Sequence, residues 1–205
     1  VQETPKGIGN ALWTCLPWLD GEPFCLVYGD VLSNGNPFIP MLDAFSESGQ
    51  DLALVTLPAS SREFGNVYLD PEMRISKLVE KPVGSQANYV FAGMFILHQN
   101  IFSRLELNGQ SMSRAFQDLI QDSVMKACLW EEGWIDIIYP WHILEANQLM
   151  MKSWKESRID QSVELKGRVQ IEGPVVIEAG VRIESGSVLK GPCYIGRDCY
   201  IGNNV

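Results

Sequence analysis

The sequence predicts a layered α/β domain over residues 1–154, followed by a solenoid of hexapeptide repeats over residues 155–205. Before residue 154, short apolar runs alternate with helical patterns, as expected where helices cover buried strands on both faces. After residue 155, an aliphatic residue returns at every sixth position, which is typical of solenoids whose coils share an apolar interior. The repeated residues are Ile159, Leu165, Ile171, Ile177, Ile183, Leu189, Ile195 and Ile201.

The first elements read in the order helix, strand, helix, strand. Apolar residues between Ile8 and Leu19 follow helical spacing, and the continuous apolar run 24–28 predicts a buried strand. A second helical stripe starts at Pro37, and a second buried strand is predicted over 52–57.

The remaining elements follow from the same rules. They are a hairpin of strands 67–69 and 74–79, a central strand 89–97, a helix around 115–120, an interrupted strand 127–138 and a helix 140–154. This alternation predicts a mainly parallel sheet between helical layers.

A second set of mostly small residues follows each aliphatic position of the repeat by four. Its members are Val163, Val169, Val175, Val181, Ser187, Cys193, Cys199 and Val205. We interpret Cys193 and Cys199 as small core residues of the solenoid. Three hexads form one coil, so the repeat makes fewer than three coils, which is close to the minimum for a stable stack. We therefore expect further sequence or a partner subunit to cover the stack, which predicts a homo-oligomer.

Composition and charge exclude several classes of protein. The formal net charge is −9, which predicts no electrostatic binding of nucleic acid. The longest strongly apolar run, 89–97, is about half the ~20 residues that a membrane-spanning helix needs. Five scattered cysteines without a C-x-x-C pair, and no visible secretory leader, predict a cytoplasmic protein. His98 and His142 are isolated in the sequence and predict no zinc site.

Two carboxylates stand where a strand ends. Asp30 follows the run 24–28 after Gly29, and Asp136 follows a second apolar stretch. At a separation of ~4 Å their repulsion is on the order of 4 kcal/mol at a near-surface effective dielectric, and a divalent cation relieves it. Magnesium favours one or two carboxylates completed by substrate phosphates and water. The structural alternatives are a turn residue for Asp30 and a helix start for Asp136.

Two further segments have the chemistry of a binding site. Pro82 holds Lys81 in extended geometry after Glu80, where the ammonium group can meet a phosphate; the alternative is solvated surface. At the N-terminus, the Gln2 amide can pair with the edge of a base, and Gly7 lets the backbone approach closely; the alternative is a plain loop.

Taken in order, these motifs resemble the sugar-1-phosphate nucleotidyltransferases over nearly the whole chain. The motifs are Gln2 with Pro5-x-Gly7, Tyr28-Gly29-Asp30, Phe64-Gly65, Glu80-Lys81-Pro82, Ala92-Gly93, and Trp134-Ile135-Asp136 followed by Pro140-Trp141-x-x-Leu144-x-Ala146-Asn147. With the hexads, the chain resembles the subgroup that carries a C-terminal left-handed β-helix. The fold that the resemblance implies is a Rossmann-like nucleotidyltransferase domain whose N-terminal part is missing, followed by an incomplete β-helix.

The resemblance implies a role for each matching residue. Gln2 and Gly7 would contact the nucleobase, and Asp30 and Asp136 would hold Mg²⁺. The expected sugar-phosphate contacts are Gly65, Glu80, Lys81, Phe91 and Gly93. A sugar-1-phosphate oxygen would attack the α-phosphorus of a nucleoside triphosphate, UTP or dTTP, and release pyrophosphate, with charge stabilised by magnesium and Lys81.

The chain departs from the family pattern at two places. The family's first strand and its Gly-rich basic loop belong before Gln2, so we expect this chain alone to be inactive. Phe91 replaces an Asn that many relatives use to bind the sugar, which leaves a backbone contact there. These departures keep open a non-catalytic sugar-nucleotide-binding or assembly subunit. Acetyl transfer by the β-helix is the weaker alternative, because the repeat contains no histidine to act as a general base.

Overall fold

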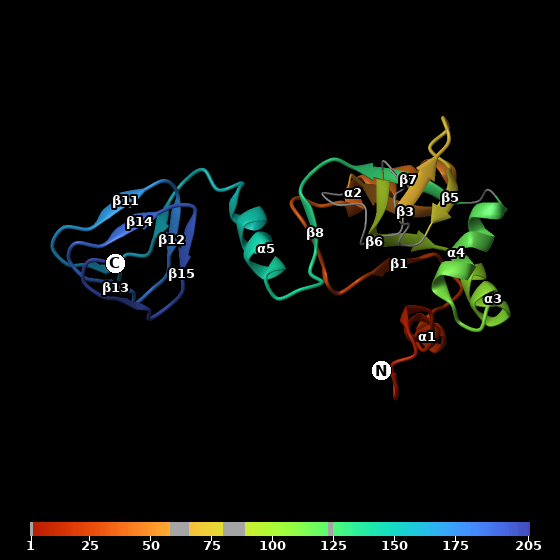
Figure 1. Ribbon diagram of the computed structural model, residues 1–205, viewed down its shortest axis with the longest axis horizontal. Helices are drawn as coiled ribbons and strands as arrows, with labels where there is room; N and C mark the ends of the chain where they lie inside the picture. The colour runs from red at the N-terminus through yellow and green to blue at the C-terminus, as the bar shows by residue number, and fades with distance from the viewer. Residues whose placement is uncertain (1, 58–65, 80–88, 123–124) are drawn as a thin grey trace. The chain divides into compact units, whose positions relative to one another are not determined.

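The computed structural model describes residues 2–57, 66–79, 89–122 and 125–205. By internal contacts the chain divides into two compact units, one ending at Ile138 and the other running from Tyr139 to Val205 (Figure 1). The contacts group the helix after Pro140 with the second unit, whereas the sequence pattern grouped it with the first. A boundary at 154/155 remains a prediction of where the repeat begins.

The first unit is built on a six-stranded sheet in the order β5-β4-β6-β3-β7, with β1 paired to the same central strand β6. The strands are β1 (Phe24–Val27), β3 (Asp51–Thr56), β4 (Asn66–Leu69), β5 (Ile75–Val79), β6 (Tyr89–Leu97) and β7 (Met125–Trp130). A separate two-stranded ribbon joins β2 (Val31–Ser33) to β8 (Trp134–Asp136).

The sheet is mixed, which corrects the expectation of a mainly parallel one. Among its described pairings, β3 with β7 is parallel, whereas β6 runs antiparallel to β1, β3 and β4, and β4 runs antiparallel to β5. Strands covered by helices on both faces read as continuous apolar runs whatever their direction. Burial of 52–56 and of most of 89–97 was therefore readable from the sequence, but strand direction was not. The prediction of a buried strand over 24–28 was wrong in its burial, because β1 alternates half-buried and exposed residues and Val27 is 44% exposed.

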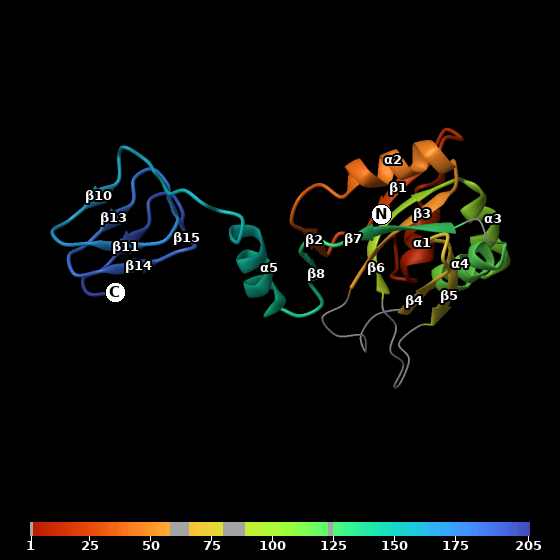
Figure 2. The same cartoon turned by 90° about the horizontal axis from the view of Figure 1, so that it is seen from above.

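Helices cover both faces of this sheet, as predicted (Figures 1 and 2). The α-helices of the unit are α1 (Ile8–Trp13), α2 (Phe38–Ser48), α3 (Asn100–Leu107) and α4 (Met112–Gln121), and a short 3₁₀ helix, η1, covers Leu16–Trp18. Helix α2 packs its Met41 against one face, while α1, α3 and α4 pack on the other. Strand β6 serves both cores, because Phe95 belongs to the first cluster and Ile96 to the second.

The second unit begins with helix α5 (His142–Met151) and continues as a β-helix. Its strands are β9 (Arg158–Ile159), β10 (Glu164–Leu165), β11 (Gln170–Glu172), β12 (Val175–Ile177), β13 (Arg182–Ile183), β14 (Val188–Lys190), β15 (Cys193–Ile195) and β16 (Tyr200–Ile201). Each strand pairs in parallel with the strand one coil away, as Ile159 with Ile177 and Ile177 with Ile195. Three hexads therefore make one coil, as the sequence predicted.

The interior of the β-helix is best buried in its middle coil. Ile177 and Ile183 are 2% and 0% exposed, whereas Ile159 and Leu165 in the first coil are 43% and 44% exposed. The buried hydroxyl of Ser187 lies within hydrogen-bond distance of two carbonyl oxygens, those of Glu184 at 2.9 Å and Gly202 at 2.8 Å, and can donate to either. The middle coil thus has neighbours on both sides and forms the core.

The two cysteines of the repeat differ in their surroundings. Cys193 is half-buried and packs against the β-helix core. Cys199 is exposed, which corrects its interpretation as a core residue. Both cysteines hold the same position in the hexad and lie in the last coil of the described chain, so burial differs between the corners of that coil.

Candidate active site

The ribbon of β2 and β8 brings the two predicted metal ligands to one place. Val31 lies directly opposite Asp136 in the antiparallel register, and the amide of Ile137 donates a hydrogen bond of 2.8 Å to the carbonyl oxygen of Asp30. Asp30 is therefore opposite Ile137, one position from Asp136, although 106 residues separate the two aspartates in sequence, and both carboxylates lie close enough to Tyr28 to raise its pKa. Two adjacent carboxylates are a donor set that fits magnesium.

The phenol of Tyr28 lies within the electrostatic reach of both carboxylates. Burial, and after it the negative charges of Asp30 and Asp136, together raise the pKa of Tyr28 to about 12. The phenol therefore stays neutral near the carboxylates at physiological pH. This residue is part of the site although its sequence motif assigned it no role.

Gly93 allows the end of β1 to lie close to strand β6. Its φ is +75°, and a Cβ built there would lie 2.8 Å from Cγ1 of Val31 and 3.1 Å from Cδ2 of Tyr28. Its carbonyl oxygen also accepts a hydrogen bond of 2.9 Å from the amide of Tyr28. The contact orders the segment that carries Asp30, so Gly93 has a structural role beside the ligand contact that the sequence predicted.

Trp134 fastens the other strand of the ribbon to the sheet. Its indole Nε1 donates a hydrogen bond of 2.9 Å to the carbonyl oxygen of Ala92 on β6. Trp134 is two residues before Asp136 on β8. Both carboxylates are thus positioned from the same short stretch of β6, at Ala92 and Gly93.

The structure also brings Gln2 and Gly7 together. The Gln2 side-chain amide donates to the carbonyl oxygen of Gly7 at 3.1 Å and to Oδ1 of Asn10 at 2.6 Å. Asn10 in turn donates to the side-chain oxygen of Gln110 at 2.7 Å. This chain of amides anchors the N-terminal segment to the turn between α3 and α4.

A cavity of about 480 Å³ connects helix α1 with the first carboxylate. Ile8 and Leu12 line it from α1, and Tyr28 and Asp30 line its other end. Its volume lies within the range of small-molecule sites, about 300–1,000 Å³. The cavity thus reaches from the start of helix α1, directly after Gly7, to Asp30.

The other predicted contacts are placed differently. The Phe91 ring packs against the rings of Phe95 and Phe116, with centroids 5.3 and 5.6 Å away, so its side chain belongs to the core. Gly65, Glu80 and Lys81 lie outside the described residues. Across the described ranges, His, Cys, Asp and Glu form no group of three or more that could hold a metal ion.

Comparison with protein families gives the fold its context. A nucleotidyl transferase model matches residues 1–153, and a model of six bacterial transferase hexapeptide repeats matches residues 174–205. The chain belongs to the nucleotidyl transferase family. The predicted fold class is confirmed in this family, as a Rossmann-like α/β domain followed by a short left-handed β-helix.

Two curated relatives of the chain come from archaea. The bifunctional protein GlmU of Methanocaldococcus jannaschii is 29% identical over 172 residues, which are 80% of this chain and 40% of that protein. The low-salt glycan biosynthesis nucleotidyltransferase Agl11 of Haloferax volcanii is 28% identical over 179 residues, which are 82% of this chain and 47% of that protein. The chain therefore spans less than half the length of these relatives.

Solved structures show the same nucleotidyl transferase fold. A putative glucose-1-phosphate thymidylyltransferase from Bacillus anthracis superposes with a TM-score of 0.66 at 18% identity, over 72% of this chain and 62% of that chain. A UTP-bound UGPase from Acinetobacter baumannii superposes with a TM-score of 0.61 at 19% identity, over 70% and 55% of the two chains.

Proposed function

We propose that the whole protein transfers a nucleotidyl group from a nucleoside triphosphate, UTP or dTTP, to a sugar-1-phosphate. The proposal rests above all on one observation: the β2–β8 ribbon brings Asp136 next to the segment of Asp30, and Asp30 lines a cavity that begins at helix α1. The names of the relatives and of the superposed structures agree with this class of reaction.

In the proposed reaction a phosphate oxygen of the sugar-1-phosphate attacks the α-phosphorus of the triphosphate. The bond from that phosphorus to the oxygen bridging to the β-phosphate breaks, and pyrophosphate leaves with the electron pair. Magnesium, when bound, neutralises the charge that develops on the phosphoryl oxygens. Asp30 and Asp136 are proposed to hold the ion from β1–β2 and β8.

The remaining residues are proposed to bind and orient the substrates. Gln2 and Gly7 would contact the base at the α1 end of the cavity, and Lys81 would neutralise phosphate charge. Gly65, Glu80 and the backbone at Phe91 and Gly93 are proposed to face the sugar phosphate. Half-buried Tyr28 would place a neutral phenol beside the carboxylates and so add no negative charge to the site below about pH 12.

The setting of the protein is also a proposal. All five cysteines are unpaired, which supports a reducing, cytoplasmic location. Within the described residues, no helix has the length and apolarity required to cross a membrane. The exposed Ile159 and Leu165 of the first coil support covering of the β-helix in a homo-oligomer.

The test is release of pyrophosphate by the full-length protein with magnesium. Each of UTP, dTTP, ATP, CTP and GTP would be combined with several sugar-1-phosphates, and pyrophosphate measured by a coupled assay. Pyrophosphate release that requires both substrates supports the transferase. Tight binding of a sugar nucleotide without release in any combination would favour the non-catalytic subunit.

A further inference from the structure

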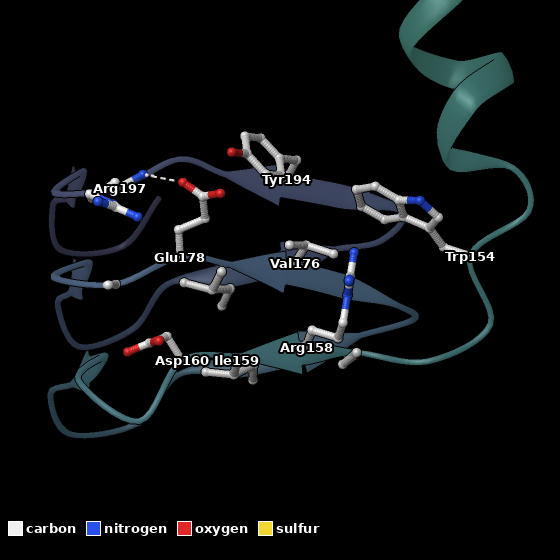
Figure 3. Close-up of a pocket in the computed structure, with 11 residues that line it drawn as sticks. Trp154, Arg158, Ile159, Asp160, Val176, Glu178, Tyr194 and Arg197 are labelled. Carbon is white, nitrogen blue, oxygen red and sulfur yellow. Dashed lines mark hydrogen bonds between the residues drawn. The ribbon is translucent and has the colours of Figure 1, made fainter.

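The β-helix carries a groove on the outer face of strands β9, β12 and β15. It has a volume of about 660 Å³ and lies entirely within the second unit (Figure 3). Its floor is a ladder of outward-facing side chains in register, Arg158 beside Val176 and Val176 beside Tyr194. None of the residues proposed for nucleotidyl transfer lines this groove, so it is a separate candidate site.

At one end of the groove the indole ring of Trp154 lies next to the guanidinium group of Arg158. Trp154 lies where the chain enters the β-helix, held by a hydrogen bond of 3.0 Å from its amide to the carbonyl oxygen of Met151. The Arg158 side chain rises beside the Trp154 indole (Figure 3). Among the described residues no carboxylate forms an ion pair with Arg158. An unpaired guanidinium binds a carboxylate or phosphate with paired hydrogen bonds.

The other end of the groove presents two ordered carboxylates. Glu178 accepts a hydrogen bond of 3.1 Å from the amide of Arg197. The neighbouring Glu178 carboxylate raises the pKa of the Tyr194 phenol. Asp160 is held through one oxygen, Oδ1, by the amide and hydroxyl of Ser162 at 2.9 and 2.6 Å. Fixed carboxylates of this kind accept hydrogen bonds from hydroxyl groups.

The charges of the groove limit the ligand. Arg158 and Arg197 are balanced by Asp160 and Glu178, so the lining has no net charge. A polyanion such as a nucleoside triphosphate would meet both carboxylates, which disfavours it. A ligand with several hydroxyl groups, one acidic group and a ring face that can cover an indole matches Arg158, Trp154 and the two carboxylates.

We propose that this groove binds an anionic saccharide. The acidic group would pair with Arg158, the C–H face of the sugar ring would lie on Trp154 above Val176, and hydroxyl groups would donate to Glu178 and Asp160. A sugar phosphate and a uronic acid share this chemistry. The site is separate from the one proposed for nucleotidyl transfer and does not depend on that activity.

The experiment is an NMR titration of the ¹⁵N-labelled chain, followed at the Trp154 indole and the amides of Arg158, Val176 and Tyr194. The probes are glucose 1-phosphate, glucuronate, glucose and UTP. We expect shifts at these groups with both anionic sugars, and about tenfold weaker binding of glucose, because it lacks the partner of Arg158. If glucose 1-phosphate binds more tightly than glucuronate, the acidic group of the ligand is a phosphate; if glucuronate binds more tightly, it is a carboxylate.

Variants make the assignment specific. Arg158→Ala should weaken the anionic sugars about tenfold and leave glucose unchanged, whereas Trp154→Ala should weaken all three. Arg168→Ala and Tyr200→Ala, also exposed on the β-helix, are matched controls expected to change nothing. Asp30→Asn should leave the groove shifts unchanged, which separates this site from the first unit.

Three results would overturn the proposal. They are an absence of shifts at the groove with either anionic sugar, equal weakening by Arg168→Ala and Arg158→Ala, and tighter binding of UTP than of both sugars. Arg158 is exposed, so its replacement leaves the coil folded and keeps the comparison valid.

Discussion

The carbonyl oxygen of Asp30 accepts a hydrogen bond of 2.8 Å from the amide of Ile137. This bond extends the β2–β8 ribbon by one residue and fixes Asp30 beside Asp136 through the backbone. The backbone positions of both aspartates are thus fixed before any ion binds. Such preorganisation lowers the cost of assembling a metal site.

Metal affinity provides a direct prediction for this pair. Asp136→Asn removes one of two adjacent carboxylates and should weaken Mn²⁺ binding, used as a probe for Mg²⁺, by at least about tenfold. Electron paramagnetic resonance of free Mn²⁺ measures the change. Asp43→Asn, at an exposed acid on α2, is the matched control and should bind Mn²⁺ like the unmodified protein. Equal affinity in both variants would contradict the site.

Gly93 predicts a difference in stability between two glycines of the site. Gly93→Ala introduces a Cβ 2.8 Å from Val31 at a φ of +75°, and should lower the free energy of unfolding by about 1–3 kcal/mol. Gly29→Ala meets nothing within 4 Å and should have a much smaller effect. Urea unfolding of both variants gives the comparison. A Gly93→Ala protein as stable as Gly29→Ala would show that β6 does not support the Asp30 segment as described.

The pKa of Tyr28 predicts a loss of stability at high pH. The folded pKa of about 12 exceeds the ordinary value of 10.0, so the unfolded chain releases the phenolic proton first. The free energy of unfolding should therefore fall between about pH 10 and 12, by up to about 2–3 kcal/mol from this residue. Below pH 10 the contribution is complete.

Tyr28→Phe isolates that contribution, because the other tyrosines titrate in both proteins. The variant should lose less stability than the unmodified protein between pH 10 and 12 in urea unfolding followed by circular dichroism. Parallel pH profiles for the two proteins would refute the raised pKa.

The β-helix predicts that stability depends on position within an identical repeat. Ile183→Ala empties a fully buried site in the middle coil and should cost about 2–5 kcal/mol. Leu165→Ala, at the equivalent position of the first coil, alters a side chain that is 44% exposed and should cost less than half as much. Denaturant unfolding of the two variants measures this, and equal costs would mean that the first coil is as well covered as the second.

Much of the fold was predictable because its signals are local. The six-residue period gave the coil length, and the apolar runs 24–28, 52–57 and 89–97 became β1, β3 and β6. Helix α3 was missed, although its residues 101, 102 and 105 have helical spacing, because they directly follow the long strand. Strand direction was not predictable, since it depends on contacts distant in sequence.

The site was predictable in its residue types more than in its geometry. Asp30 and Asp136 each stand after an apolar run, which suggested both. Strand β2, which joins them, has three residues and is too short for a reliable pattern. The role of Tyr28 depends on burial and on two charges from different strands, and no local motif encodes that combination.

The measurement that most directly tests the account is pyrophosphate release by the full-length protein carrying Asp136→Asn, compared with Asp43→Asn. Both variants would be assayed with magnesium and the best pair of nucleoside triphosphate and sugar-1-phosphate. The account predicts a loss of about 10²-fold or more for Asp136→Asn and normal release for Asp43→Asn, because one carboxylate of the metal pair is gone. Equal rates in the two variants would contradict the assignment of the catalytic centre to Asp30 and Asp136.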